Sequence, residues 1–145
     1  MTFLSNKDVL SLQDISSKEI LSIIKLANTF KKELKNRKSL LLLKGKVFGM
    51  IFQKPSTRTR VSFETGISQL GGNTVYLGVN DIHLSRGESI EDTARTLSLY
   101  LNCIIGRVYD HADIQKLAYW ASIPVINGLS DTFHPCQILA DLLTI

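Results

Sequence analysis

Residues 46–60, KVFGMIFQKPSTRTR, combine an apolar run with a segment rich in hydroxyl and guanidinium groups. The run at 46–52 is short and apolar, as expected for a strand that is covered on both faces. Pro55 interrupts it, and residues 57–70 have helical character and are followed by Gly71-Gly72, which is typical of a helix end. The stretch therefore predicts a strand, a loop and a helix in succession.

The same order of elements recurs along the chain. Further strands are predicted at residues 74–77, 103–108 and 123–127, and further helices at residues 17–37, 90–101, 111–121 and from residue 135 to the end. Ser16 with Glu19 forms a capping-box pattern, and Ser89 is a second predicted cap. Asn127-Gly128 is predicted to begin a loop. Four strand–helix units in a row predict an α/β fold, a four-stranded parallel sheet flanked by helices in three α/β/α layers.

Composition indicates a soluble globular protein with one domain. The chain has 145 residues, of which 44% are hydrophobic and 21% charged. No stretch approaches the roughly 20 apolar residues that cross a bilayer, and no signal-peptide core follows the N-terminus, so we expect a cytoplasmic protein without a membrane partner. Cys103 and Cys136 form no CxxC pair, which indicates neither a disulfide framework nor a zinc site.

The net charge of +4 has two sources in the sequence. A basic run at residues 31–38 is interpreted as a solvated helix end; nucleic-acid binding is the alternative, and the run lacks the interleaved aromatic residues that this function favours. We therefore expect no nucleic-acid partner. A second cationic group is scattered in the sequence and comprises Lys54, Arg58, Arg60, Arg86 and Arg107.

The segment STRT at 56–59 is the strongest candidate for an anion site. It lies between a predicted strand and a predicted helix, where unpaired N–H groups and the helix dipole attract anions. The hydroxyl groups add donors, and Arg58 adds a planar fork that suits phosphate oxygens. The alternative is that Ser56 only caps the helix and the arginines are surface charge. The GxxxxGK[ST] pattern of a Walker A loop is absent.

Two further strand ends carry polar groups. The motif HPCQ at 134–137 follows the fourth predicted strand, and Arg107 ends the third. His134 could donate to an oxyanion or transfer a proton, and Gln137 could bind an amide; a structural histidine is the alternative. Residues 83–88, HLSRGE, could form a lid or a solvated loop. Because these ends share one edge of a parallel sheet, they predict a ligand with a phosphate and a carbonyl group.

Four blocks together resemble the ornithine carbamoyltransferases: FQKPSTRTRVSFE at 52–64, RGESIEDTARTLS at 86–98, RVYDH at 107–111 and VINGLSDTFHPCQILADLLTI at 125–145. The resemblance implies transfer of the carbamoyl group of carbamoyl phosphate to the δ-amine of ornithine, without a metal or an organic cofactor. It also implies a role in arginine biosynthesis and a homotrimer, or a multiple of trimers. Within it, residues 1–145 correspond to the carbamoyl-phosphate-binding domain.

The resemblance also implies roles for individual residues. The phosphate would be bound by Ser56, Thr57, Arg58, Thr59 and Arg107. The carbonyl oxygen would be surrounded by the catalytic residues Thr59, Arg107 and His134, and the carbamoyl amine would be bound by Gln137. His83 would bind carbamoyl phosphate in trans, in the active site of a neighbouring subunit.

The ornithine-binding half of the family pattern has no counterpart in this sequence, since neither an SMG nor an HCLP motif occurs. We therefore expect a truncated chain that lacks the second domain, binds the electrophile and is inactive by itself. Three alternatives remain at this level: an aspartate carbamoyltransferase, a carbamoyltransferase for another amine, and a non-catalytic anion-binding module.

Overall fold

The computed structural model describes residue 4 and residues 8–38, 40–82 and 87–145. In this part of the chain, helices and strands alternate as predicted. Their order is α1 (Ser17–Lys35), β1 (Val47–Phe52), α2 (Thr57–Gln69), β2 (Asn73–Gly78), α3 (Ile90–Ser98), β3 (Cys103–Arg107), α4 (His111–Trp120), β4 (Val125–Leu129) and α5 (Pro135–Thr144).

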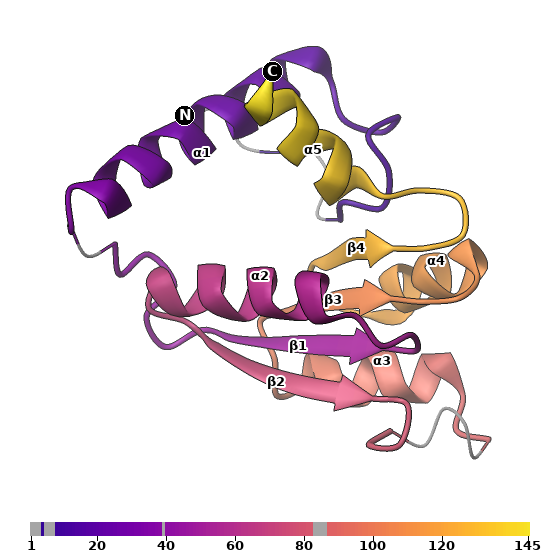
Figure 1. Ribbon diagram of the computed structural model, residues 1–145. Coiled ribbons are helices and arrows are strands. Elements are labelled where there is room, and N and C mark those ends of the chain that lie inside the picture. Colours follow the sequence, from indigo (N-terminus) through magenta and orange to yellow (C-terminus); the bar gives the residue numbers. More distant parts are fainter. Residues whose placement is uncertain (1–3, 5–7, 39, 83–86) are drawn as a thin grey trace.

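All four strands are parallel and lie in the order β2-β1-β3-β4 (Figure 1). The predicted four-stranded parallel sheet is thus confirmed. The chain first moves from β1 outward to β2 and then returns past β1 to β3, so its direction reverses between β1 and β3. In open α/β sheets the loops on either side of such a reversal diverge and leave a crevice at the carboxyl ends of the strands.

Helices cover both faces of the sheet, which confirms the three predicted layers. Side chains alternate along β1: Met50 and Phe52 point to one face, where they pack with Ile67 of α2, and Ile51 points to the other, where it packs with Ile114 of α4. α3 lies on the same face as α4. α1 packs against α5 (Figure 1). The strand ends that concern the site are therefore held by a core on each side.

The predicted helix caps are confirmed. The Ser16 and Glu19 side chains each bond to the other residue's backbone N–H, at 3.3 and 2.9 Å, which completes a capping box. Ser89 Oγ accepts from the Asp92 N–H at 3.0 Å and caps α3. Gly71, with φ of 84°, follows the C-cap of α2, where a left-handed residue ends the helix without steric cost.

The predicted boundaries of β4 are wrong. The strand was expected at 123–127 with a loop from Asn127, and it occupies Val125–Leu129. Asn127 is compatible with a buried strand because its Nδ2 donates to the carbonyl oxygens of Leu10 and Phe133, at 3.0 and 3.2 Å. A Cβ at Gly128 would lie 3.3 Å from the carbonyl oxygen of Gly106, so glycine permits close packing here rather than a turn.

Four helices also end earlier than predicted, α1 at Lys35, α2 at Gln69, α3 at Ser98 and α4 at Trp120. At the end of α3, Ser98 Oγ donates to the Ala94 carbonyl at 2.7 Å and accepts from the Ser122 N–H at 3.1 Å, which connects this helix to the segment before β4. Within the described part of the chain, no helix is long and apolar enough to span a membrane.

Candidate functional site

A cavity of about 650 Å³ lies at the carboxyl ends of β1, β3 and β4. It is lined by Ser56, Arg58, Thr59, Ser62, Phe63, Arg107, Leu129, His134, Cys136, Gln137 and Ala140. We call it the strand-edge cavity. The three strand ends that the sequence predicted to converge do so, at the edge of the sheet where the chain reverses direction. Two arginines and no carboxylate line the cavity, so its electrostatics favour an anion.

The start of α2 and the end of β3 are joined by a chain of hydrogen bonds. Ser56 Oγ caps α2 by accepting from the Thr59 N–H at 3.3 Å, and it donates to Thr59 Oγ1 at 3.0 Å. Arg107 Nη1 donates to the same oxygen at 3.1 Å. Because Thr59 Oγ1 already accepts twice, its own proton is available to a ligand in the cavity.

Arg58 and Arg60 point in different directions. Arg58 lines the cavity, whereas Arg60 does not. The Nε of Arg60 pairs with Glu64 Oε1 at 3.0 Å, and its guanidinium carbon lies 3.8 Å from the centre of the Tyr76 ring. Arg60 is therefore occupied by an ion pair and by a cation–π contact, and it is not part of the cavity lining.

Arg107 has an unused donor. Its Nε is buried and has no hydrogen-bond partner among the described residues. A buried N–H group without an acceptor is unfavourable, and a hydrogen bond to a bound anion would remove this cost. The guanidinium at the end of β3 is therefore suited to donate a hydrogen bond to a ligand oxygen in the strand-edge cavity.

The start of α5 supplies an imidazole and an amide. His134 is the N-cap, and its Nδ1 accepts from the Gln137 N–H at 3.4 Å. Burial lowers the pKa of His134, the positive charge of Arg107 lowers it further, and Asp141 opposes both. Gln137 Nε2 donates to Asp141 Oδ1 at 2.8 Å, which leaves Oε1 as its available acceptor.

Four other positions named in the sequence analysis differ in their placement. Cys136 lines the cavity, but burial raises the pKa of its thiol to about 11, as expected of a packing residue and not of a nucleophile. Thr57 begins α2, and its exposed side chain is not part of the cavity lining. His83 and Arg86 lie outside the described residues.

Sequence reasoning missed several lining residues. Ser62 and Phe63 lie one turn after Thr59, and Ala140 lies one turn after Gln137. Helical spacing from the motif residues is a signal that could have found them, because positions three and four apart share a face. Leu129 was missed because β4 was predicted to end at residue 127. Among the described residues, no group of three or more His, Cys, Asp or Glu side chains could hold a metal ion.

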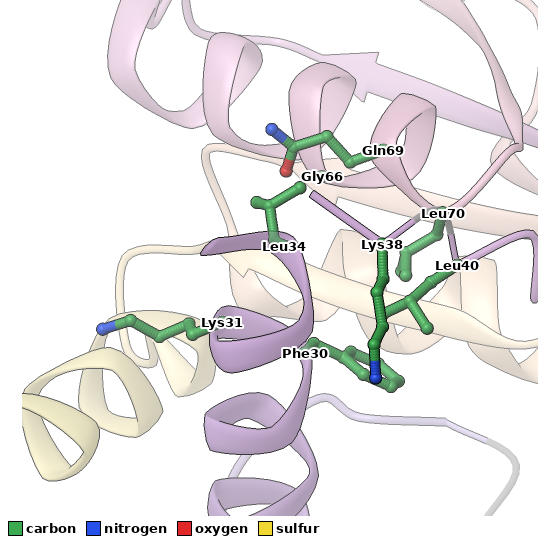
Figure 2. Close-up of a pocket in the computed structure, with 8 residues that line it drawn as sticks. All are labelled: Phe30, Lys31, Leu34, Lys38, Leu40, Gly66, Gln69 and Leu70. Atoms are coloured by element: carbon green, nitrogen blue, oxygen red, sulfur yellow. The ribbon is translucent and has the colours of Figure 1, made fainter. Parts of the chain in front are cut away.

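A second cavity, of about 170 Å³, lies between α1 and α2 (Figure 2). It is lined by Phe30, Lys31, Leu34, Lys38, Leu40, Gly66, Gln69 and Leu70. We call it the helix cavity. Lys31 extends away from the other labelled side chains (Figure 2), and Lys38 Nζ pairs with Glu33 Oε2 at 2.8 Å. The cationic groups at this cavity therefore do not converge on one point.

Known proteins resemble this chain over nearly its whole length. Residues 7–145 match the family described as aspartate/ornithine carbamoyltransferase, carbamoyl-P binding domain. The anabolic ornithine carbamoyltransferase of Pyrococcus furiosus is 55% identical over 98% of this chain, and the ornithine carbamoyltransferase of Thermococcus kodakarensis is 56% identical over the same share. The chain spans 45% of the length of each of these relatives.

Solved structures give the same result. The ornithine carbamoyltransferase of P. furiosus superimposes with a TM-score of 0.96 at 54% identity, over 100% of this chain and 46% of that protein. The catalytic subunit of the aspartate transcarbamoylase of M. jannaschii superimposes with a TM-score of 0.90 at 35% identity, over 97% of this chain and 46% of that subunit. The chain belongs to the aspartate/ornithine carbamoyltransferase family.

Proposed function

We propose that this chain is the carbamoyl-phosphate-binding domain of an ornithine carbamoyltransferase of arginine biosynthesis. The reaction transfers the carbamoyl group of carbamoyl phosphate to the δ-amine of ornithine and yields citrulline and phosphate. Ornithine is favoured as the acceptor because relatives that are 55–56% identical bear this name, whereas the aspartate transcarbamoylase subunit is 35% identical. The second half of the relatives, which this chain does not span, would complete the acceptor site.

The observation that carries the proposal is the set of donors around the strand-edge cavity. Arg58, Arg107 and the Thr59 hydroxyl converge there, and no carboxylate lines the cavity. A phosphate dianion next to a polarised carbonyl needs this combination of positive charge and directed donors. In the proposed complex, the phosphate is bound by Ser56, Thr57, Arg58, Thr59 and Arg107. Thr57 contributes through the backbone N–H groups at the start of α2.

The carbonyl oxygen of the substrate is assigned to Thr59, Arg107 and His134. Because Nδ1 of His134 accepts from the Gln137 N–H, the neutral imidazole carries its proton on Nε2 and can donate it to an oxygen. The lowered pKa favours this neutral form. Gln137 is assigned to the carbamoyl amine, whose N–H can donate to its Oε1. These roles orient the carbamoyl carbon for attack.

The proposed step is a direct transfer. The lone pair of the δ-amine nitrogen attacks the carbamoyl carbon, a C–N bond forms, and the bond from that carbon to the phosphate oxygen breaks. The electron pair leaves with phosphate, and the proton lost from the amine passes to phosphate or solvent. Donors aimed at the carbonyl oxygen and at the leaving oxygen stabilise the charge that grows there. The step requires neither a metal nor an organic cofactor, since the leaving group is already good.

A covalent enzyme intermediate is not expected on this path. Cys136 has a raised pKa, and His134 is engaged as a cap through Nδ1, so neither is an activated nucleophile. Rapid quenching of turnover followed by mass spectrometry would check this point. A carbamoyl or phosphoryl adduct on either side chain would contradict direct transfer.

The cellular context is part of the same proposal. We propose a cytoplasmic enzyme that assembles as a homotrimer or a multiple of trimers, with His83 reaching the carbamoyl phosphate of a neighbouring subunit. The partners are carbamoyl phosphate and ornithine, with no nucleic acid and no membrane. The resemblance of the four sequence blocks supports the location, the assembly and the role of His83. The names of the relatives support the two substrates.

The test is a fusion of residues 1–145 with the part of the P. furiosus enzyme that follows the matching segment. This enzyme is chosen because its matching segment superimposes on this chain with a TM-score of 0.96 at 54% identity. We expect the fusion, once shown to unfold cooperatively, to form citrulline from carbamoyl phosphate and ornithine. The same fusion with Arg58→Ala is the matched control. A folded fusion that forms no citrulline, or that carbamoylates aspartate instead, would contradict the proposal.

A further inference from the structure

Arg107 lies at an irregular strand end. The register between β3 and β4 shifts between Gly106 and Arg107, so that Gly106 faces Asn127 while Arg107 faces Leu129. Ladder pairing with β4 is therefore interrupted at the residue whose guanidinium faces the strand-edge cavity. The remaining neighbour of β3 is β1, whose last residue, Phe52, faces Arg107.

Gln53, the residue after β1, continues this contact and extends it. Its backbone N–H donates to the Arg107 carbonyl at 2.8 Å. Its side chain uses both ends of the amide: Oε1 accepts from the Tyr109 N–H at 2.7 Å, and Nε2 donates to Asp113 Oδ2 at 3.2 Å. One side chain thus connects the end of β1 to the turn after β3 and to the first turn of α4.

We infer that Gln53 is a positioning residue for the anion site. It fixes the turn that follows Arg107 and so holds the guanidinium against Thr59, facing the cavity. Gln53 is not part of the cavity lining, so it acts through Arg107 and not on the ligand. The ligand involved is the carbamoyl phosphate of the proposed function, on which this inference rests. The placement of Arg107 can, however, be measured without any ligand.

The direction of the hydrogen bond between the Gln53 and Asp113 side chains can be reversed by substitution. Gln53→Glu keeps the length of the side chain and the acceptor for the Tyr109 N–H, but it sets a carboxylate against Asp113 in place of a donor. Gln53→Met removes both hydrogen bonds. In the double variant Gln53→Glu with Asp113→Asn, the new asparagine amide donates to the new carboxylate, and the bridge is restored in the opposite direction.

The experiment measures hydrogen exchange of the Arg107 Nε–H by NMR in the ligand-free chain, carbamoyl phosphate affinity by calorimetry, and the melting temperature. We expect slow exchange in the unaltered chain, because this N–H is buried. Gln53→Glu and Gln53→Met should speed the exchange and weaken binding about tenfold, the equivalent of one hydrogen bond. The double variant should recover slow exchange and most of the affinity.

Two outcomes would overturn the inference. One is a lower melting temperature in the single variants while Arg107 exchange and affinity stay unchanged, which is the result of a purely structural role. The other is a loss of slow Arg107 exchange and of carbamoyl phosphate affinity in the single variants that the double variant does not restore. If the unaltered chain binds no carbamoyl phosphate, the proposed function fails, and the Arg107 exchange rates in the three variants still decide whether Gln53 positions this side chain.

Discussion

The strand-edge cavity and the helix cavity differ in where their charged groups point. In the strand-edge cavity, Arg107 and the Thr59 hydroxyl are joined by a hydrogen bond and share one space with Arg58. In the helix cavity, Lys31 points away from the other side chains (Figure 2). Lys38 is paired with Glu33. Both cavities contain two cationic residues, and only one has them converging on a common point.

The difference follows from the fold. Loops at the carboxyl ends of parallel strands bring residues that are distant in sequence to one edge, with helix N-termini directed at the same space. The helix cavity lies between the C-terminal parts of α1 and α2, where the dipoles favour cations and oppose anions. Position in the fold, more than the number of basic residues, therefore makes a cavity suitable for an anion.

The largest expected effect is a difference in activity between variants of Arg58 and Arg60. Arg58→Ala should reduce the activity of the fusion enzyme by roughly 10²–10³, the usual cost of removing a donor that stabilises transition-state charge. Arg60→Ala should have a much smaller effect, because Arg60 is bound to Glu64 and Tyr76 outside the cavity. Steady-state assays of both variants provide the measurement. Equal losses would show that the assignment of Arg58 is wrong.

A smaller effect is expected in the helix cavity, and it concerns stability alone. Gly66 is inside α2, and a Cβ there would meet no atom within 4 Å. Gly66→Ala should therefore raise the free energy of unfolding by about 0.5–1 kcal/mol, since alanine restricts the unfolded chain more than glycine does. Urea unfolding measures this change. Carbamoyl phosphate affinity should stay the same, and a change in affinity would mean that the two cavities are coupled.

The pH dependence of stability provides a further test, through His134 in the strand-edge cavity. Burial and the charge of Arg107 lower the pKa of His134 below its ordinary 6.5, so the folded state binds its proton more weakly than the unfolded state. The contribution of neutral His134 to the free energy of unfolding is complete above pH 6.5 and is lost as the pH falls through the lowered pKa. His134→Gln should lose less stability over this window than the unaltered chain. Urea unfolding at several pH values would show this, and parallel curves would contradict it.

Much of the fold could be predicted from local patterns. The capping serines, the apolar run of β1 and the glycine after α2 each act within a few residues, and the structure confirms them. The end of β4 could not be predicted, because Asn127 is stabilised in the strand by carbonyl groups at residues 10 and 133 that no local pattern identifies. The strand order likewise depends on packing across the whole sheet.

The site could be predicted in part, and the missing part depends on contacts between residues that are distant in sequence. Arg58, Arg107, His134 and Gln137 were found because each lies at the end of a strand or in the segment after it, and the ends of parallel strands meet. The placement of Arg60 depends on its ion pair with Glu64 and on its contact with the ring of Tyr76, which lies in β2. The role inferred for Gln53 depends on contacts with Tyr109 and Asp113, more than 50 positions away.

A control from the helix cavity should show the smallest effect. Lys38→Met removes an exposed ion pair with Glu33, and such pairs contribute about 0–1 kcal/mol to stability. We expect no measurable change in carbamoyl phosphate affinity by calorimetry. A clear loss of affinity would indicate that the anion binds at the helix cavity, and it would contradict the distinction drawn between the two cavities.

The most direct test of the central claim is a titration of the chain with carbamoyl phosphate followed by NMR, with inorganic phosphate as the competitor. We expect shifts in the backbone signals of residues 57–60 and in the side-chain signals of Arg107 and Gln137. The signals of Phe30, Leu34 and Leu70 at the helix cavity should not move. Shifts centred on the helix cavity, or no shifts at millimolar ligand, would contradict the assignment of the strand-edge cavity as the carbamoyl phosphate site.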